Sequence, residues 1–413
     1  MRLLTEYLPP ETFGGYKLAL AGVSLIAGIG VRPFIQYAMR AYHDAAVSGG
    51  LHRFLTRSAR SFGAYVAALG LAVAAAGWVL TRGGGGLGPA VPALLGAVLA
   101  LQALVERDRA LSVTRGRQGA AESVGVGLAW LIPVAVAGSV LVGGSLSVVL
   151  AAHAGALGLL LLAPRLAHGR GTGGDRGAPG AADAVDATGA AGSAWTYAWP
   201  LVAAGCLSWL AHESDRFILG YYHGAGAVGL YAAAYGLASA PFTAAAGAAA
   251  QVMLPVAFAA SARAGGDAVP AAPRSVFAGA LLVGAGGVCV VWLAGDRIAG
   301  LLLAESYRAA APDLMVWIAL GYACFGAAMC LDLAAFGAKR TVFVMIASGA
   351  AAVTNVGLDL LLVPARGATG AAVATAAALC VYLLCMAGLL RAAQPGRAAG
   401  AGTQRAGAER EHG

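Results

Sequence analysis

The stretch ESDRFILGYYHGAGAVGLY at residues 213–231 decides the fold. It lies within a long apolar segment, Trp195 to Pro255, and places Glu213, Asp215 and Arg216 near the end of one hydrophobic run. A short uncharged turn and a second hydrophobic run follow. Charged side chains cost free energy inside an apolar span and are usually kept for a function. The chain is therefore expected to be organised around this point.

The composition is that of a polytopic membrane protein. The chain has 413 residues, of which 59% are hydrophobic and 11% charged, with a mean hydropathy of +0.75. Soluble domains have about 25% charged residues. The net charge is +8. Because the arginines cluster between apolar runs, this charge indicates the positive-inside pattern of membrane proteins rather than nucleic-acid binding.

Eleven apolar runs are long enough to cross a bilayer, since a transmembrane helix needs about 20 residues. The sequence therefore predicts an all-α fold. The eleven predicted spans are 16–39, 62–80, 87–105, 123–142, 145–163, 196–220, 228–256, 276–303, 311–336, 341–363 and 368–390.

Basic residues occur in every second connection between these spans. Arginine or lysine lies in 40–61, 106–122, 164–194, the loop after 256, the turn at 339–340 and the tail after 390. The alternate connections are short and nearly uncharged. All eleven spans thus fit one topology in the cell (cytoplasmic or inner) membrane, with the C-terminus in the cytoplasm.

We expect four regions. Residues 1–163 form an N-terminal transmembrane bundle, and residues 195–391 a C-terminal bundle of six helices. Residues 164–194, rich in Gly, Ala and Asp and without periodicity, predict a flexible cytoplasmic linker. Residues 392–413 predict a disordered cytoplasmic tail.

The two bundles share a short repeat. Gly14-Gly15-Tyr16 aligns with Gly229-Leu230-Tyr231, and each motif follows a turn and opens a long span. Internal repeats are common in transporters, where the substrate site lies between them. The second half has a charged helix, 196–220, before its motif, whereas only residues 1–11 precede the first. One N-terminal helix is therefore expected to be missing, through a late start site or a truncation. Restoring it would give twelve spans.

Several motifs, in order, resemble the polysaccharide-biosynthesis flippase family of Wzx-like lipid-linked oligosaccharide transporters, within the multidrug/oligosaccharidyl-lipid/polysaccharide exporter superfamily. The likeness covers nearly the whole chain. It rests on LPPETFGGY (8–16), DRFILG (215–220), VGLY (228–231) with Ala234-Tyr235, ESYR (305–308) with Ala311-Pro312, GAKRT (337–341), NVGLDLLLVP (355–364) and GAAVAT (370–375).

The resemblance implies two helix bundles around a central cavity. They would rock between inward-open and outward-open states and carry a polyprenyl-diphosphate-linked oligosaccharide, an exopolysaccharide or O-antigen-type unit, across the membrane. Its implied partners are the lipid-linked oligosaccharide, membrane lipids, and a polymerase and glycosyltransferases of the same pathway. No nucleic acid, cofactor or metal ion is expected.

Arg32 is the first predicted substrate-binding residue. On a helix rising 1.5 Å per residue it lies roughly 6–8 Å to the cytoplasmic side of the centre of its span. Pro33 follows and predicts a kink. A guanidinium in this position suits a diphosphate, which it binds in a bidentate fashion. The alternatives are a structural pair with a carboxylate on another helix, and snorkelling to the interface.

Glu213, Asp215 and Arg216 complete the predicted substrate-binding set. Glu213 and Arg216 are three residues apart and share a helix face. They are expected to face the cavity, where they bind sugar or couple transport to protons, with Glu213 as the proton carrier. In the alternative, Asp215 and Arg216 reach the membrane interface.

Other polar residues in the spans have simpler explanations. Asp332 and Asp359 lie near span ends and are interpreted as interfacial or helix-terminal charges. Asn355 predicts a hydrogen bond between helices. The six cysteines lie inside apolar runs without metal-binding spacing, so they are interpreted as small buried hydrophobic residues without disulfides.

Two other functions stay open. One is a multidrug or small-molecule exporter of the same fold, which Glu213 and Asp215 as cation-coupling carboxylates would suit. The other is a membrane glycosyltransferase or polymerase. The short outer loops and the lack of phosphate-binding Gly loops, metal motifs and nucleophile elbows disfavour any enzyme.

Overall fold

A computed structural model describes residues 1–47, 49–82, 88, 90–167, 187–263, 274–337 and 340–393. All regular structure in these residues is helical, as the sequence predicts. The helices are α1 (Arg2–Tyr7), α2 (Pro10–Gly30), α3 (Arg32–Val47), α4 (Leu51–Arg82), α5 (Val91–Thr114), α6 (Gln118–Gly138), a 3₁₀ turn η1 (Ser139–Val142), α7 (Leu146–Ala167), α8 (Ala187–Arg263), α9 (Arg274–Leu302), α10 (Glu305–Arg308), α11 (Ala311–Gly337) and α12 (Thr341–Ala392).

Two of these helices each contain two of the predicted spans. α8 turns back at Gly224, with φ of 78°, and α12 turns back at Gly367, with φ of 56°. A positive φ is accessible to glycine at low cost, so a tight reversal can form there. With α8 and α12 each divided at its glycine, the described helices cover all eleven predicted spans at least in part.

Six described helices are long and apolar enough to cross a membrane. They are Pro10–Gly30, Leu51–Val79, Gln118–Val142, Val276–Leu302, Ala311–Phe336 and Val342–Ala392, and the last contains the turn at Gly367. Leu146–Leu162 is a shorter apolar helix. The multi-pass architecture expected from composition is thus present in the structure.

The predicted kink of the first span is present. The span bends at Val31, where α2 ends and α3 begins, in the turn that precedes Pro33 and that the proline ring disrupts. One predicted boundary needs correction. The predicted linker is helical at both ends, because α7 continues to Ala167 and α8 begins at Ala187. Residues 168–186 of the linker, and the tail from 394, lie outside the described residues.

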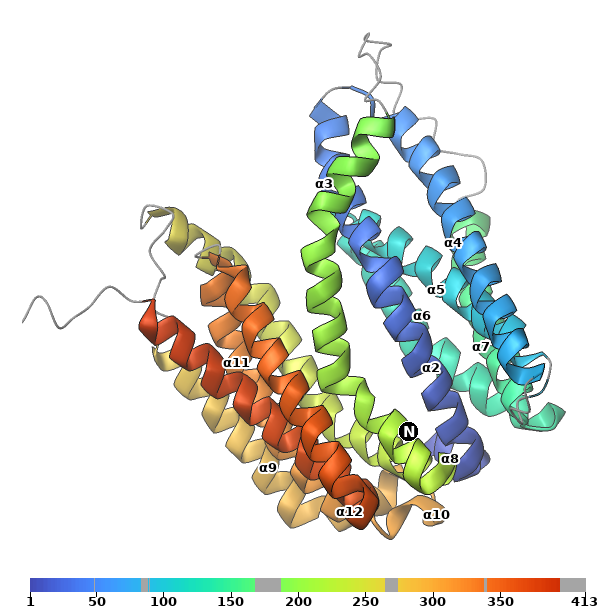
Figure 1. Cartoon of the computed structure of the whole chain (residues 1–413), viewed down its shortest axis with the longest axis vertical. Coiled ribbons are helices and arrows are strands. Elements are labelled where there is room, and N and C mark those ends of the chain that lie inside the picture. Colours follow the sequence, from blue (N-terminus) through green and yellow to red (C-terminus); the bar gives the residue numbers. More distant parts are fainter. Residues whose placement is uncertain are drawn as a thin grey trace, which may run out of the picture.

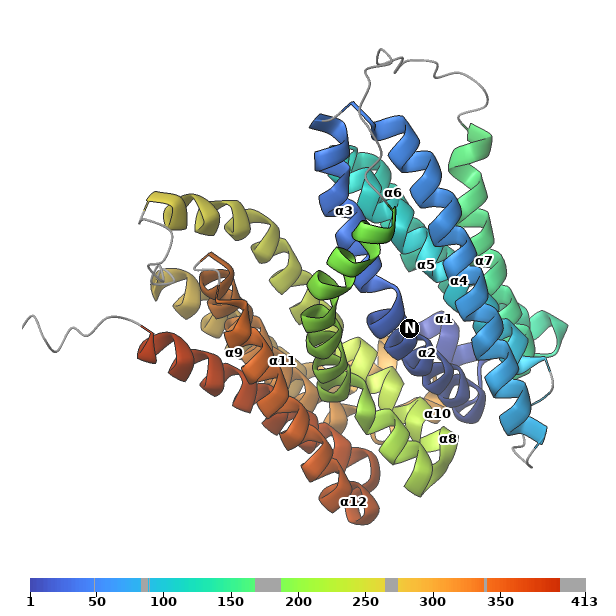
Figure 2. The same ribbon diagram turned by 45° about the horizontal axis from the view of Figure 1, so that its top comes forward.

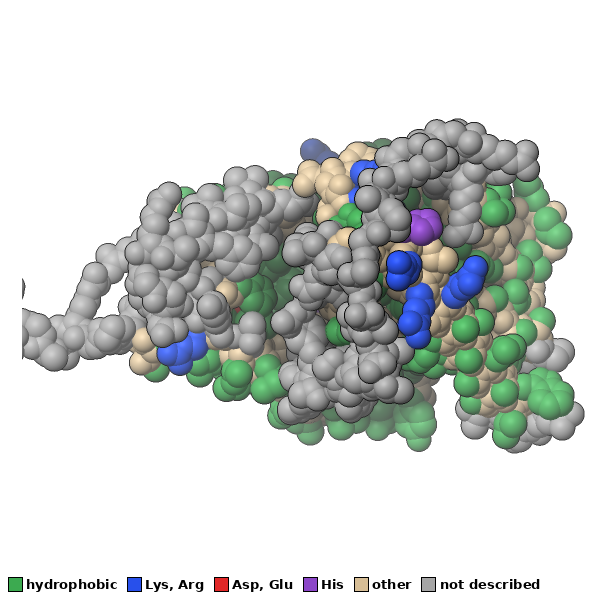
Figure 3. All heavy atoms as spheres, turned by 90° about the horizontal axis from the view of Figure 1, so that it is seen from above, with side chains coloured by type: hydrophobic (Ala, Val, Ile, Leu, Met, Phe, Trp, Pro, Cys, Tyr) green, Lys and Arg blue, Asp and Glu red, His purple; other side chains and the backbone are tan. Residues whose placement is uncertain are grey.

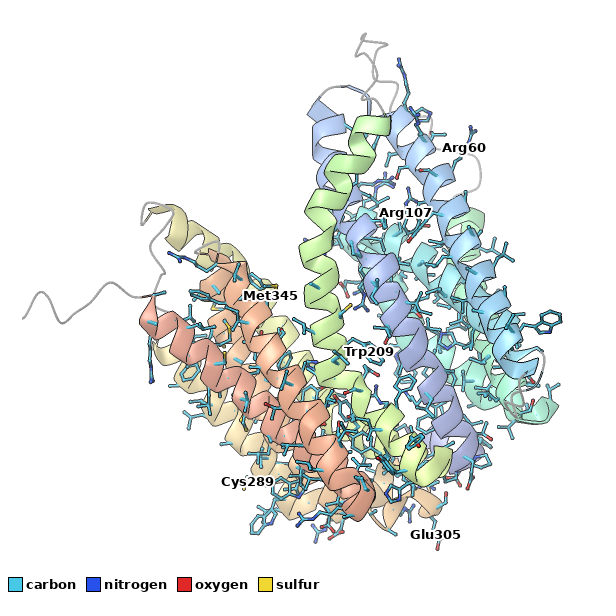
Figure 4. All side chains as sticks on the ribbon, viewed as in Figure 1. Arg60, Arg107, Trp209, Cys289, Glu305 and Met345 are labelled. Carbon is cyan, nitrogen blue, oxygen red and sulfur yellow. The ribbon has the colours of Figure 1, made fainter. Side chains whose placement is uncertain are left out.

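The helices form two bundles that meet at one end and diverge toward the other (Figures 1 and 2). α2 to α7 make the first bundle, and α8, α9, α11 and α12 make the other. Arg60 and Arg107 lie at the end where the bundles diverge, and Glu305 lies at the end where they meet (Figure 4). Figure 3 views the diverging end, which we call the arginine-rich end, and shows Lys and Arg side chains on it.

Hydrogen bonds from the first residues close the opposite end. The guanidinium of Arg2 donates to the carbonyl of Leu303 at 2.6 Å, and the phenol of Tyr307 donates to the carbonyl of Leu8 at 2.7 Å. The backbone N–H of Ala304 donates to Thr5 Oγ1 at 3.0 Å. α1 thus ties the start of the chain to α9 and α10 of the second bundle.

The repeated glycines lie at the point where the bundles touch. A Cβ added to Gly14 would lie 1.7 Å from the carbonyl oxygen of Ala225, and one added to Gly229 would lie 2.0 Å from that of Pro10. In the repeat alignment Gly14 corresponds to Gly229, and Pro10 to Ala225. The two contacts are therefore equivalent to each other under the internal repeat. Small residues let helix backbones approach closely in lipid. The repeat seen in the sequence is therefore the contact between the two halves.

The close contact of Gly14 and Gly229, which we call the Gly14–Gly229 crossing, predicts that a larger residue at either position destabilises the fold. Gly14→Ala and Gly229→Ala should each lower the free energy of unfolding by about 1–3 kcal/mol, because the methyl group overlaps a backbone oxygen that cannot move alone. Thermal unfolding of the purified protein in nanodiscs measures the effect. Gly22→Ala is the control, since a Cβ there meets no atom within 4 Å. Equal stability of the Gly22 and Gly229 variants would contradict the proposed crossing.

Candidate functional site

A cavity of about 350 Å³ lies between helices from both halves of the chain. Its walls come from α2, α5, α6 and α7 of the first bundle and from α8, which carries the charged motif. Its polar lining residues are Lys17, Ser24, Gln102, Glu106, His153, Glu213 and Arg216, and its apolar ones are Leu20, Ala21, Val105, Leu128, Ile132 and Leu157. The cavity therefore combines polar and charged side chains with apolar walls.

Trp209 holds the wall formed by α8 against α2. Its indole Nε1–H donates to the carbonyl of Ala21 at 2.9 Å and to Ser24 Oγ at 3.1 Å. Figure 4 shows Trp209 between the two helices. Because Ala21 and Ser24 both line the cavity, this contact joins the second half of the chain to the cavity wall.

Two of the four predicted site residues line the cavity, and they form an ion pair. Arg216 Nη1 contacts Glu213 Oε2, as expected for residues three apart on a helix. The guanidinium carbon of Arg216 lies 4.9 Å from the centre of the Tyr235 ring, within the range of a cation–π contact. Arg216 Nε is buried and has no hydrogen-bond partner among the described residues. Arg216 therefore keeps one free donor.

Lys17 is a cavity cation that the sequence analysis did not single out. It follows Tyr16 at the start of the first predicted span, where a lysine looks like an ordinary end-of-span charge. In the structure Lys17 lines the cavity, and its ammonium lies 5.3 Å from the Phe13 ring centre. Within the described part of the chain no carboxylate forms an ion pair with it.

Arg32 lies beside the cavity rather than in its lining. Its Nε is 3.8 Å from Glu106 Oε2, and 60% of its side chain is exposed. Glu106 does line the cavity, and it accepts a hydrogen bond of 3.1 Å from Gln102. The pairing matches the structural alternative considered for Arg32, and its exposure leaves the guanidinium accessible to a ligand.

Asp215 faces away from the cavity, into the second bundle. The residue is fully buried. Its Oδ2 accepts a hydrogen bond of 2.5 Å from the Tyr231 phenol and one of 3.4 Å from Thr375, and its Oδ1 accepts one from the Arg216 backbone N–H at 2.7 Å. These donors explain how a carboxyl group is tolerated here.

Asp359, interpreted from the sequence as an interfacial or helix-terminal charge, is linked to the residue next to Asp215 through Asn355 and Ser214. It is fully buried on α12 and accepts a hydrogen bond of 3.1 Å from Asn355, which also donates to Ser214 of α8 at 3.3 Å. The bond to Ser214 confirms the contact between helices predicted for Asn355. We call Asp215, Tyr231, Asn355, Asp359 and Thr375 the carboxylate cluster.

Two oxygens of the carboxylate cluster, Asp359 Oδ1 and Asn355 Oδ1, are buried without a partner in the described structure. Unpaired buried acceptors are costly, so they suit a proton or a small cation. In the described residues no group of three or more His, Cys, Asp or Glu side chains is arranged to hold a metal ion.

Asp332, interpreted as an interfacial or helix-terminal charge, is buried between helices near the end of α11. Asp332 is 8% exposed, and both of its oxygens lie 3.0 Å from the Tyr382 hydroxyl. Sequence position alone did not predict the burial of either acid, because this burial depends on how α11 and α12 pack against other helices. The cysteines are unbridged, although Cys324 and Cys380 lie 3.2 Å apart at sulfur.

His153 of α7 is a further cavity residue that the sequence analysis did not identify. It lies in the lining and is 5% exposed. Its Nδ1 lies 2.7 Å from the hydroxyl of Tyr16, the tyrosine of the first repeat motif. No spacing pattern in the sequence connects positions so far apart, so only the packing of α7 on α2 reveals the pair.

Parts of the chain are similar in sequence, and nearly the whole chain is similar in fold, to known proteins. The model of a family described as polysaccharide biosynthesis protein matches residues 187–306. An inward-facing multidrug resistance MATE family transporter of the MOP superfamily has a TM-score of 0.75 and 15% identity, over 95% of this chain and 93% of that one. The lipid II flippase MurJ, in an inward closed conformation, has a TM-score of 0.60 and 12% identity, over 92% and 85%.

An outward-facing MATE family transporter of the MOP superfamily has a lower TM-score, 0.55, at 17% identity over 95% of this chain and 91% of that one. No curated protein matches the chain. The family model thus confirms the resemblance to polysaccharide biosynthesis proteins over residues 187–306. Over nearly the whole chain, the fold is the one seen in MATE family transporters and MurJ.

Proposed function

We propose that this protein flips a polyprenyl-diphosphate-linked oligosaccharide across the cytoplasmic membrane by alternating access. The observation that carries the proposal is the placement of Lys17 and Arg216 in one cavity lined by both halves of the chain. The match of residues 187–306 to the polysaccharide biosynthesis family supports this substrate class.

The cavity lining holds two cations, Lys17 and Arg216, and two acids, Glu106 and Glu213. The donors that the acids leave free on the cations suit an anionic passenger. Lys17 has no carboxylate partner in the described structure, and Arg216 keeps a buried Nε–H free although its Nη1 pairs with Glu213. Ammonium and guanidinium groups form strong charge-assisted hydrogen bonds with phosphate oxygens. We assign the diphosphate to these two cations. Arg32 stays a proposed contact nearer the arginine-rich end, and Glu213 stays a proposed proton carrier that would release Arg216 when protonated.

The shape of the molecule supports alternating access. Its bundles diverge at the arginine-rich end and are joined at the other by the Gly14–Gly229 crossing and by α1. By the positive-inside rule the arginine-rich end is cytoplasmic, as is the C-terminus. This conformation then accepts substrate from the cytoplasm, where lipid-linked sugars are assembled by glycosyltransferases. A polymerase would act on the product on the other side.

The carboxylate cluster supplies a site for the coupling ion. Two carboxyl groups in an apolar span are stable when they are protonated or paired with a cation. Asp359 Oδ1 and Asn355 Oδ1 are free to bind one. Asp215 stays within the proposed site, but its role is in this cluster rather than in contact with sugar.

Export of small molecules is the second candidate, because MATE family transporters share the fold. A flippase is expected to confer no dye efflux or drug resistance, and an exporter should confer both. The cavity residues are assigned to binding and none to bond-making chemistry, so we propose that the protein is not an enzyme.

Removal of the Lys17 charge should weaken binding of a polyprenyl diphosphate. Lys17→Gln keeps a similar length and loses one charge-assisted contact, so the affinity measured in nanodiscs should fall about 10- to 100-fold. Arg32→Gln should cost less, since Arg32 lies outside the lining. Arg60→Gln, at the exposed arginine-rich end, is the control for general charge. Unchanged affinity of the Lys17 variant, at wild-type stability, would refute its role.

Asp359→Asn should uncouple transport from its driving ion. In proteoliposomes, flipping of a fluorescent polyprenyl diphosphate by the native protein should accelerate under an inward Na⁺ or proton gradient, whereas the variant should run at the gradient-free rate. The amide cannot take up the positive charge that the carboxylate binds. Asp313→Asn, at the exposed start of α11, is the control. A variant that still responds fully to the gradient would exclude the cluster.

A further inference from the structure

The Tyr16–His153 pair stands at the cavity wall, next to Lys17. Tyr16 is 3% exposed and His153 is 5% exposed, and their contact of 2.7 Å joins α2 to α7. An imidazole and a phenol can each donate or accept, and the two arrangements present different nitrogens to the cavity. The direction of this hydrogen bond therefore decides what His153 offers a ligand.

The surroundings of Tyr16 favour the phenol as the donor. Within the described structure its hydroxyl contacts only His153 Nδ1. If His153 donated instead, the phenol proton would be buried without an acceptor, which costs about 1–3 kcal/mol. If Tyr16 donates, Nδ1 is the bare nitrogen, and the single N–H of the neutral ring is on Nε2. Because His153 lines the cavity, that N–H is available to a ligand there.

The second repeat supports the same direction. Tyr231 corresponds to Tyr16, and its hydroxyl donates to Asp215 Oδ2 at 2.5 Å. In each half, the tyrosine two residues after the crossing glycine thus reaches a titratable group of its own bundle. In the second half that group is a carboxyl buried with other donors around it, and the phenol serves it as a donor.

We propose that His153 Nε2–H and the Lys17 ammonium form a subsite for a phosphate group, and that Tyr16 is a positioning residue that fixes the His153 tautomer. The inference rests on the proposed function and adds a specific contact to it. Lys17 supplies charge, and the imidazole supplies one directed neutral donor. The phosphate would be that of a lipid-linked diphosphate.

A matched pair of variants separates the two nitrogens of His153. A Gln side chain reaches the Nε2 position, so His153→Gln keeps the donor to the cavity and loses the acceptor for Tyr16. An Asn side chain reaches the Nδ1 position, so His153→Asn keeps the acceptor and loses the donor. Affinity for inorganic pyrophosphate, measured by calorimetry on the full chain in nanodiscs, should be nearly native for Gln. For Asn it should fall about tenfold.

The reverse order, with Asn near native and Gln impaired, would overturn the subsite, as would equal affinity for native protein, Gln and Asn variants. Thermal unfolding of each variant identifies losses due to misfolding. Polyprenyl diphosphate and phosphatidylglycerol are tested alongside pyrophosphate. Tight binding of the first and no binding of the second support a lipid-linked diphosphate, whereas equal binding of both lipids would overturn that assignment.

The tautomer itself is measurable without any transport. Solid-state ¹⁵N NMR of histidine-labelled protein, with the His153 signals assigned by their loss in His153→Gln, should show a bare Nδ1 and a protonated Nε2. Pyrophosphate should shift Nε2, and Tyr16→Phe should give a mixture of tautomers. A protonated Nδ1 in the native protein would overturn the inference and leave the flippase proposal standing. Absent lipid flipping with the expected tautomer would refute the proposed function instead.

Discussion

The structure depends on a backbone contact between two glycines that occupy equivalent places in a repeat. At Gly14 and Gly229 the two halves approach so closely that a single methyl group would overlap a carbonyl oxygen of the other half. Such a contact is directional, and it sets the rotation of α2 and of the second part of α8. It also places Tyr16 and Tyr231, two residues further along, each toward the interior of its own bundle.

From this contact the two halves acquire different chemistry. Beyond the crossing, the first half continues with Lys17 and encloses a cavity with His153, while the second half encloses two acids, Asp215 and Asp359. A buried charge in lipid needs a partner, a proton or a ligand. We therefore propose that the cavity beside the first half receives an anion and that the carboxylate cluster of the second half receives a proton or cation. α8 connects them, because Asp215 and Arg216 are neighbours that point into different sites.

Much of the fold could be predicted because span length, arginine distribution and the glycine-tyrosine repeat are properties of the chain itself. Glu213 and Arg216 could be predicted as a cavity pair from their spacing, because charged side chains on so apolar a helix cost free energy unless they are paired or face a polar cavity. The positions of Lys17 and His153 in the cavity and the burial of Asp359 could not be predicted. The direction in which each of these side chains points depends on how α2, α7 and α12 pack. The position of Lys17 near a span end resembles that of an interfacial lysine. The pairing of Arg32 with Glu106 of α5, beside the cavity lining, likewise depends on how α3 packs against α5.

We propose that a cavity between two rocking bundles moves an anionic lipid head group across the bilayer. The most direct measurement is the flipping of a fluorescent polyprenyl diphosphate by the purified protein in liposomes, followed by quenching from outside. We expect protein-containing liposomes to equilibrate the probe between leaflets much faster than empty ones, and excess unlabelled polyprenyl diphosphate to compete with the probe. A rate equal to that of protein-free liposomes, with correctly folded protein present, would contradict this proposal.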